Sequence, residues 1–328
     1  MQPVWFLSHG SPTFLTEPNR TTAFWTRLAP LVAPEVRAVL CISAHWDAPA
    51  PRLAGAVPHP AIQHDFYGFS PALYAQSWPA QGDAALGRWL RETLVAQGIP
   101  VLAEERPFDH GVWLPFKYIW PAAPLPVFQL SLCVREGGPW HLALGEALAP
   151  LRQAGVLIVG SGGITHNLGE IHWHAPEGQA ASWAVEFMTA LEQTLEAGDR
   201  EALCHPWTLP HGRRAIPRWS ITCPSWWLWA LPARRAWRRN IATGCSALWR
   251  CMPMAPTPCR PSGGAHLVGP TRGKPCAQLG RMPDGRRVRL ANRGMIGAVN
   301  PPWGRYLIRA MGRPERHAGP SASRPAGN

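Results

Sequence analysis

Four short runs of apolar residues predict buried strands along the first half of the chain. They cover residues 3–7, 38–42, 126–132 and 156–160, and several are rich in Val, Ile and Leu. Runs of this length with β-branched residues are typical of strands that are covered on both faces, as in a parallel sheet.

Helical candidates lie between and after these runs. They cover residues 21–31, 83–97, 140–154 and 180–197, and the last shows apolar residues at helical spacing. Strands that alternate with helices indicate the α/β class. We therefore expect a single domain with a mainly parallel central sheet flanked by helices.

Histidines follow three of the predicted strands. His9 and His45 come soon after the first two runs, and His166 follows the fourth across a glycine-rich loop. A further histidine, His110, stands beside Asp109 in a segment, residues 108–113, that we expect to be a loop. Ligands of open α/β sheets bind outside the carboxyl ends of the strands. Imidazoles brought to that edge could form part of a metal site, or they could merely hold loops in place.

Five motifs around these histidines resemble a known family. They read Ser-His-Gly-Ser-Pro at 8–12, Ser-Ala-His-Trp at 43–46, His-Asp-Phe-x-Gly-Phe-x-x-x-Leu-Tyr at 64–74, Asp-His-Gly-x-Trp at 109–113 and Gly-Ser-Gly-x-x-x-His-Asn-Leu at 160–168. Their order and spacing resemble the LigB-type (class III) extradiol ring-cleavage dioxygenases, and most closely the 4,5-DOPA extradiol dioxygenase-like group. The resemblance runs from residue 2 to about residue 215.

The resemblance implies roles for individual residues. His9 and His45 match metal ligands, and His166 matches either a further metal ligand or an acid/base residue. His110 matches a catalytic pocket histidine, able to hydrogen-bond the ring oxygens of the substrate or O2. His64 and Asp65 match the substrate entrance, although these two residues could instead stabilise a loop.

The implied reaction is the oxidative opening of a catechol ring. A catechol binds a divalent metal through two adjacent oxygens, so the metal needs few protein ligands and open positions. Fe(II) would activate O2, whereas Zn(II) in the same site would be redox-silent. Two other interpretations remain open: a zinc-dependent hydrolase that uses the same ligands, or an inactive metal-binding product of a damaged gene.

The expected end of the family pattern is missing. Members of the family carry a final motif, His-Pro-Thr-x-Glu-His-Tyr-Leu-Pro-Leu, which is absent after Ala215. Read one base out of register, the codons of residues 215–232 permit this motif, and Trp226-Trp227 must give Val because Trp has a single codon. Residues 249–255 permit the family's closing strand in the same register. The sequence thus predicts a catalytic domain at 1–215, a frameshift after it, and impaired activity.

Charge changes sign at the same place. Residues 1–215 contain 13 Lys and Arg against 18 Asp and Glu, whereas residues 216–328 contain 19 against 2. A basic tail can indicate nucleic-acid binding, but this one lacks helical or strand periodicity. We expect an unstructured, out-of-frame tail, with no nucleic-acid or membrane partner beside the catechol and O2.

Scattered cysteines and the lack of a secretory or membrane-spanning run favour a cytoplasmic protein. The pattern carries no signal for an oligomeric state.

Overall fold

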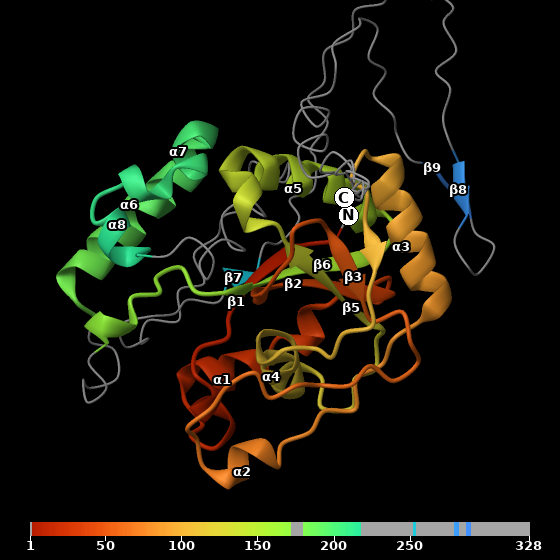
Figure 1. Ribbon diagram of the computed structural model, residues 1–328, viewed down its shortest axis with the longest axis horizontal. Coiled ribbons are helices and arrows are strands. Elements are labelled where there is room, and N and C mark those ends of the chain that lie inside the picture. Colours follow the sequence, from red (N-terminus) through yellow and green to blue (C-terminus); the bar gives the residue numbers. More distant parts are fainter. Residues whose placement is uncertain (1, 172–179, 218–251, 254–278, 282–286, 290–328) are drawn as a thin grey trace, which may run out of the picture.

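The computed structural model describes residues 2–171, 180–217, 252–253, 279–281 and 287–289 (Figure 1). Its centre is a seven-stranded sheet with the strand order β4-β3-β5-β2-β6-β1-β7. The strands are β1 (Val4–Ser8), β2 (Ala38–Asp47), β3 (Arg52–Ala54), β4 (Leu102–Ala103), β5 (Val127–Leu132), β6 (Val156–Gly162) and β7 (Met252–Pro253). Two further short strands, β8 (Leu279–Arg281) and β9 (Arg287–Arg289), pair with each other.

The core of the sheet is parallel. Strand β6 pairs in parallel with both β1 and β2, and β2 pairs in parallel with β5. Antiparallel pairing is confined to β3 against β5 and to β7 against β1 at the edge. The predicted α/β class with a mainly parallel sheet is therefore confirmed.

Eight α-helices and five short 3-10 helices accompany the sheet in the part of the chain that the structure describes. The α-helices are α1 (Arg20–Trp25), α2 (Pro71–Tyr74), α3 (Ala84–Ala96), α4 (His110–Ile119), α5 (Gly137–Gln153), α6 (Ser182–Ala197), α7 (Arg200–Cys204) and α8 (Gly212–Ala215). The 3-10 helices are η1 (Pro12–Leu15), η2 (Ala29–Leu31), η3 (Val134–Glu136), η4 (Leu168–Glu170) and η5 (Pro206–Thr208). None of the described helices is long and apolar enough to cross a membrane.

Helices cover both faces of the sheet, which explains why its central strands carry apolar residues on both faces. Leu40 and Ile42 of β2 belong to one hydrophobic cluster with residues of α3 and α5. Val39 and Cys41, which alternate with them, belong to a second cluster with residues of α1 and α4. Figure 1 shows the two pairs of helices on opposite sides of the sheet. Side chains alternate between the two faces of a strand, so each face needs its own apolar set.

A third cluster joins helices α6, α7 and α8 to strand β1. Phe187 of α6 is fully buried, and Phe6 of β1 packs into the same cluster. Ala215 and Ile216 are buried there too, with exposures of 0% and 6%. The ordered packing therefore reaches the point at which the family pattern breaks off.

Three predicted elements need correction. The helix expected over 21–31 ends at Trp25 and is followed by η2; Pro30 has no backbone N–H, so a continued α-helix would lack the hydrogen bond to the carbonyl oxygen of Thr26. The strand expected over 38–42 continues to Asp47, so His45 lies within β2 rather than after it. The expected loop at 108–113 contains the start of helix α4, whose first residue is His110.

Most of the tail predicted to be unstructured, residues 216–328, lies outside the described residues. The domain limit at Ala215 and the frameshift therefore stay predictions.

Candidate metal centre

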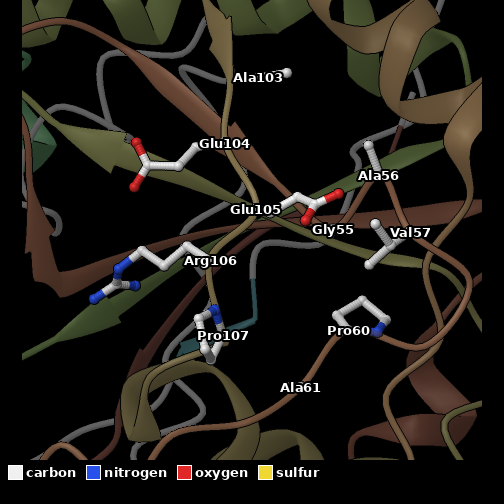
Figure 2. A pocket seen from close by; sticks show the side chains of 10 residues that line it. All are labelled: Gly55, Ala56, Val57, Pro60, Ala61, Ala103, Glu104, Glu105, Arg106 and Pro107. Carbon is white, nitrogen blue, oxygen red and sulfur yellow. The ribbon is translucent and has the colours of Figure 1, made fainter.

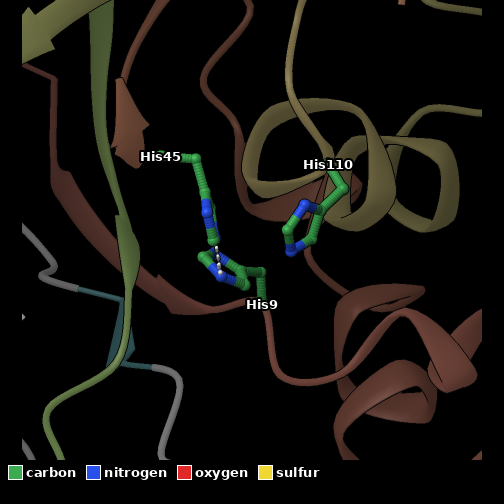
Figure 3. Close-up of side chains that lie close together, drawn as sticks. All are labelled: His9, His45 and His110. Carbon is green, nitrogen blue, oxygen red and sulfur yellow. Dashed lines mark hydrogen bonds between the residues drawn. The ribbon is translucent and has the colours of Figure 1, made fainter. Parts of the chain in front are cut away.

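Three histidines meet at the carboxyl edge of the sheet. His9 follows directly after β1, His45 lies near the end of β2, and His110 opens helix α4. Strands β1 and β2 are both neighbours of β6 and run in parallel, so their carboxyl ends reach the same edge. One nitrogen from each imidazole lies within 4.8 Å of the others (Figure 3).

Of the three rings, those of His9 and His45 have nitrogens at the spacing expected for two ligands of one metal ion. Their Nε2 atoms are 2.9 Å apart. Two nitrogens that bind one ion at right angles, each at about 2.1 Å, are about 3.0 Å apart. Imidazole nitrogens are suitable ligands for both Zn(II) and Fe(II). The donor set therefore fits a divalent metal at this position.

His110 reaches the other two rings because Gly111 has no side chain. The ring centroid of His110 is 4.1 Å from that of His45 and 5.1 Å from that of His9. A Cβ atom at position 111 would overlap Ser43 Oγ and come within 3.1 Å of His9 Nδ1. The glycine of the Asp-His-Gly motif thus allows the start of α4 to lie against the end of β1.

A hydroxyl group fixes the ring of His9. Its Nδ1 lies 2.9 Å from Ser161 Oγ, and this hydroxyl donates its hydrogen to the carbonyl oxygen of Gly111. The Ser161 oxygen must therefore accept a hydrogen from His9 Nδ1. That tautomer leaves a lone pair on His9 Nε2, where a metal would bind.

A carboxylate holds the ring of His110. Asp65 Oδ1 accepts hydrogen bonds from the backbone N–H of His110 at 2.8 Å and from its Nδ1 at 2.9 Å. Asp65 Oδ2 lies 3.8 Å from Nδ1 of His45. Burial by itself would raise the pKa of Asp65, but the hydrogen bonds and charge of His110 outweigh burial and lower this pKa to about 2. The carboxyl group is therefore ionised at neutral pH.

The imidazoles of His9 and His45 are neutral at neutral pH, as metal ligands must be. Burial, followed by the proximity of His110, lowers the pKa of His45 to about 4. Burial and the neighbouring imidazoles of His45, His110 and His166 lower the pKa of His9 well below its usual value.

A second, fully buried carboxylate lies behind the centre. Asp109 accepts hydrogen bonds from Ser43 Oγ at 2.6 Å and from Gln129 Nε2, and it pairs with Arg106 at 3.2 Å. Ser43 Oγ also accepts the backbone N–H of His45, and Arg106 donates to the carbonyl oxygen of His45. Asp109 therefore ties the backbone of β2 to the start of α4.

The other predicted site residues lie outside the group of three. His166 has a partly buried ring, and burial lowers its pKa. His166 is close enough for its charge to act on His9 and His45. The Nε2–H of His64 donates to the backbone carbonyl oxygen of Gln76 at 3.0 Å, and the ring packs against that of Trp113. Its contacts are those of a residue that holds a loop.

Sequence patterns did not single out the polar side chains that hold the histidines and Asp109 in place. Ser43, Gln129 and Ser161 each lie within a buried strand and have an exposure of 0%. A polar residue inside an otherwise apolar strand must find a hydrogen-bond partner. That signal was present in the sequence and would have pointed to these three positions.

A cleft of about 370 Å³ opens beside the strands β3 and β4 (Figure 2). It is lined by Gly55, Ala56, Val57, Pro60, Ala61, Ala103, Glu104, Glu105, Arg106 and Pro107. None of the three clustered histidines lines this cleft. The candidate site is therefore defined by the imidazoles, and the cleft shares only Arg106 with the groups behind them.

Comparisons with known proteins agree with this geometry. Residues 3–208 match the family model described as the catalytic LigB subunit of aromatic ring-opening dioxygenase. The chain is 36% identical over 193 residues to a 4,5-DOPA dioxygenase extradiol of Escherichia coli K12, a match that covers 59% of this chain and 70% of that protein. It is also 36% identical over 203 residues to the protein of the same name from Portulaca grandiflora, covering 60% of this chain and 73% of the relative.

A solved structure supports the same relationship. The crystal structure of an uncharacterized protein from Escherichia coli K12 superposes with a TM-score of 0.63 at 25% identity, covering 78% of this chain and all of the other. The family model matches well over half of the chain and spans all three clustered histidines. The chain therefore belongs to the LigB family of ring-opening dioxygenases, which are metal-dependent oxidoreductases without haem.

Proposed function

We propose that this chain is an extradiol dioxygenase that opens the ring of a DOPA-like catechol with O2. The observation that carries the proposal is the convergence of His9, His45 and His110 at the carboxyl edge of a parallel sheet. The relatives named 4,5-DOPA dioxygenase extradiol support the choice of substrate class. Residues 1–215 form the catalytic domain in this proposal.

His9 and His45 hold the metal, and His110 serves the substrate. Iron(II), when bound, supplies the redox chemistry that O2 requires and that zinc lacks. His110 keeps its hydrogen on Nδ1 for Asp65, so its Nε2 is free to accept the hydrogen of a catechol hydroxyl. A ring nitrogen that carries a lone pair can accept that proton.

His166 is the second proton-transfer group in this proposal. Its ring is close enough to His9 and His45 for its charge to lower their pKa values. Its backbone N–H donates to the carbonyl oxygen of Ala215 at 2.9 Å. The position of its loop is thus tied to the last residues before the predicted frameshift. A disturbed chain after Ala215 would misplace His166, which is one physical reason to expect impaired turnover.

A zinc-dependent hydrolase is the second candidate. Catalytic zinc sites commonly use three protein ligands with water in the fourth position, and three imidazoles can provide such a set. The two candidates differ in their need for O2. Only the first consumes O2 when iron and a catechol are present.

The first experiment measures metal content and O2 consumption in the same preparations. The chain repaired by one base near the codon of Ala215, loaded with Fe(II), is mixed with DOPA, and we expect O2 uptake and a yellow semialdehyde, with weak or no turnover in the unrepaired chain. We expect the double variant His9→Ala, His45→Ala to lose bound iron and zinc while it stays folded. Unchanged metal content in that variant, or hydrolysis without O2 uptake in the repaired chain, would reject the dioxygenase proposal.

A second experiment tests the impairment. We propose that a single-base repair near the codon of Ala215 restores the final motif and raises turnover well above that of the present chain. The unrepaired chain serves as the control at equal iron content. Equal turnover in the two proteins would show that the final motif is dispensable.

A further inference from the structure

We propose that Asp65 is a positioning residue that orients the imidazole of His110, so that its Nε2 faces the centre formed by His9 and His45. There this nitrogen serves the substrate or, in protein loaded with zinc alone, acts as a third ligand. The inference rests on the proposed metal centre and adds a residue that acts through its neighbours. It assigns to Asp65 a role different from direct contact with the substrate.

Both oxygens of Asp65 face imidazoles. Oδ1 accepts the backbone N–H of His110, so this oxygen is an acceptor, and the nearby Nδ1 of His110 must contribute a hydrogen. Oδ2 lies 3.8 Å from Nδ1 of His45. The carboxyl side chain is only 20% exposed. The hydrogen bond therefore fixes the tautomer of His110 with hydrogen on Nδ1 and a lone pair on Nε2, whereas His45 only lies near the carboxylate charge.

The loop that carries Asp65 is fastened to the chain just before helix α4. Ile62 and Phe108 form a parallel bridge, and the backbone N–H of Gln63 donates to the carbonyl oxygen of Phe108 at 2.8 Å. Trp113 of α4 donates its indole N–H to the carbonyl oxygen of Gln63 at 2.9 Å. These bonds fix the loop relative to His110, so Asp65 meets the ring at a defined position.

A carboxylate that accepts the Nδ1–H of an imidazole changes the basicity of the ring more than a hydroxyl group does. The three rings differ in this respect, since His9 is held by the neutral Ser161 and His110 by the charged Asp65. A hydrogen bond to a carboxylate raises the basicity of the ring and fixes its orientation. Loss of such a partner at metal sites typically lowers metal affinity by about 10- to 100-fold.

The test uses the full chain without metal and then with zinc alone. Histidine tautomers are read from long-range proton–nitrogen NMR spectra of protein labelled with nitrogen-15 histidine. We expect the wild type to show His110 with hydrogen on Nδ1 only, and Asp65→Ala to show a mixture of tautomers. Ser161→Ala should change the signals of His9 and leave those of His110, which identifies the residue affected.

Zinc affinity is then measured by competition with a chromophoric chelator. We expect Asp65→Ala to lower the affinity by about tenfold or more. Asp47→Asn is the matched control, because Asp47 lies on the same strand as His45 and accepts the backbone N–H of Val134 without touching an imidazole. We expect its affinity to equal that of the wild type.

Asp65→Asn covers the case in which Asp65→Ala does not fold. The amide keeps the shape and one acceptor oxygen for the backbone N–H of His110 but loses the charge. We expect a folded protein with weaker zinc binding. Unchanged zinc affinity and an unchanged His110 tautomer in a folded Asp65 variant would overturn the role of Asp65. A wild-type chain that binds no zinc would remove the metal centre itself, and this role with it.

Discussion

Two carboxylates lie on either side of the first turn of helix α4, and they differ in burial and in what they hold. Asp109 is fully buried and accepts from Ser43, Gln129 and Arg106, which belong to the sheet and to the loop before the helix. Asp65 is partly exposed and accepts from His110. The deep carboxylate joins backbone elements, whereas the shallow one faces the rings.

This difference in burial predicts that Asp109 supports the stability of the fold, whereas Asp65 supports the orientation of the imidazoles. Removing a buried charge that several donors share leaves those donors without partners, and the cost falls on folding. Removing a carboxylate at the rim leaves fewer buried groups unpaired and affects mainly the rings that it orients. Four predictions follow from this division and from the burial of the histidines, in order of their expected effect on stability.

The largest effect is expected for Asp109→Ala. It leaves the guanidinium of Arg106 and the side chains of Ser43 and Gln129 without their shared acceptor. We expect the free energy of unfolding to fall by about 3 kcal/mol or more. Urea denaturation followed by circular dichroism measures this change. The division between the two carboxylates would be wrong if Asp65→Ala were equally destabilising.

An intermediate effect is expected from pH. The pKa of Asp65 is about 2 in the folded protein, below its ordinary value of 3.8, so its contribution is complete above about pH 4 and is lost as the pH falls toward 2. We expect the difference in unfolding free energy between the wild type and Asp65→Asn to shrink over this range. A difference that stays constant from pH 5 to pH 2.5 would contradict the ion pair.

Two buried histidines, His45 and His141, make the free energy of unfolding depend on pH at higher pH values than Asp65 does. Burial lowers the pKa of His45 and of His141 to about 4, so the folded protein keeps them neutral while the unfolded chain protonates them near pH 6.5. The unfolded state then binds more protons between these values, and stability falls as the pH is lowered from about 6.5 to 4. This window lies above that of Asp65, which allows the two contributions to be separated.

The smallest effect on stability is expected for His166→Ala. Its ring is only partly buried, and its backbone hydrogen bond to Ala215 does not depend on the side chain. We expect a change below about 1 kcal/mol in unfolding free energy and a loss of ring-cleaving turnover in the frame-restored protein. Full turnover in this variant would exclude His166 from proton transfer.

Strands were easier to predict than the helix that carries the third histidine. The runs at 3–7, 126–132 and 156–160 became β1, β5 and β6 because burial on both faces leaves an apolar run in the sequence. Helix α4 was missed because it contains Gly111 and Pro115 and is buried nearly all round, so no amphipathic period marks it. Packing against the sheet stabilises it instead.

The sequence by itself determined the alternation of strands and helices, the sheet edge at which His9 and His45 would appear, and the reversal of charge near residue 215. These features depend on local periodicity, chain order and composition, which can all be read from the linear amino-acid sequence. Only the tertiary structure decided that His110 would join them and that Asp65, 45 residues earlier, would hold its ring. Such a meeting depends on how a helix and a loop pack against each other, and the spacing of residues along the chain does not encode that distance.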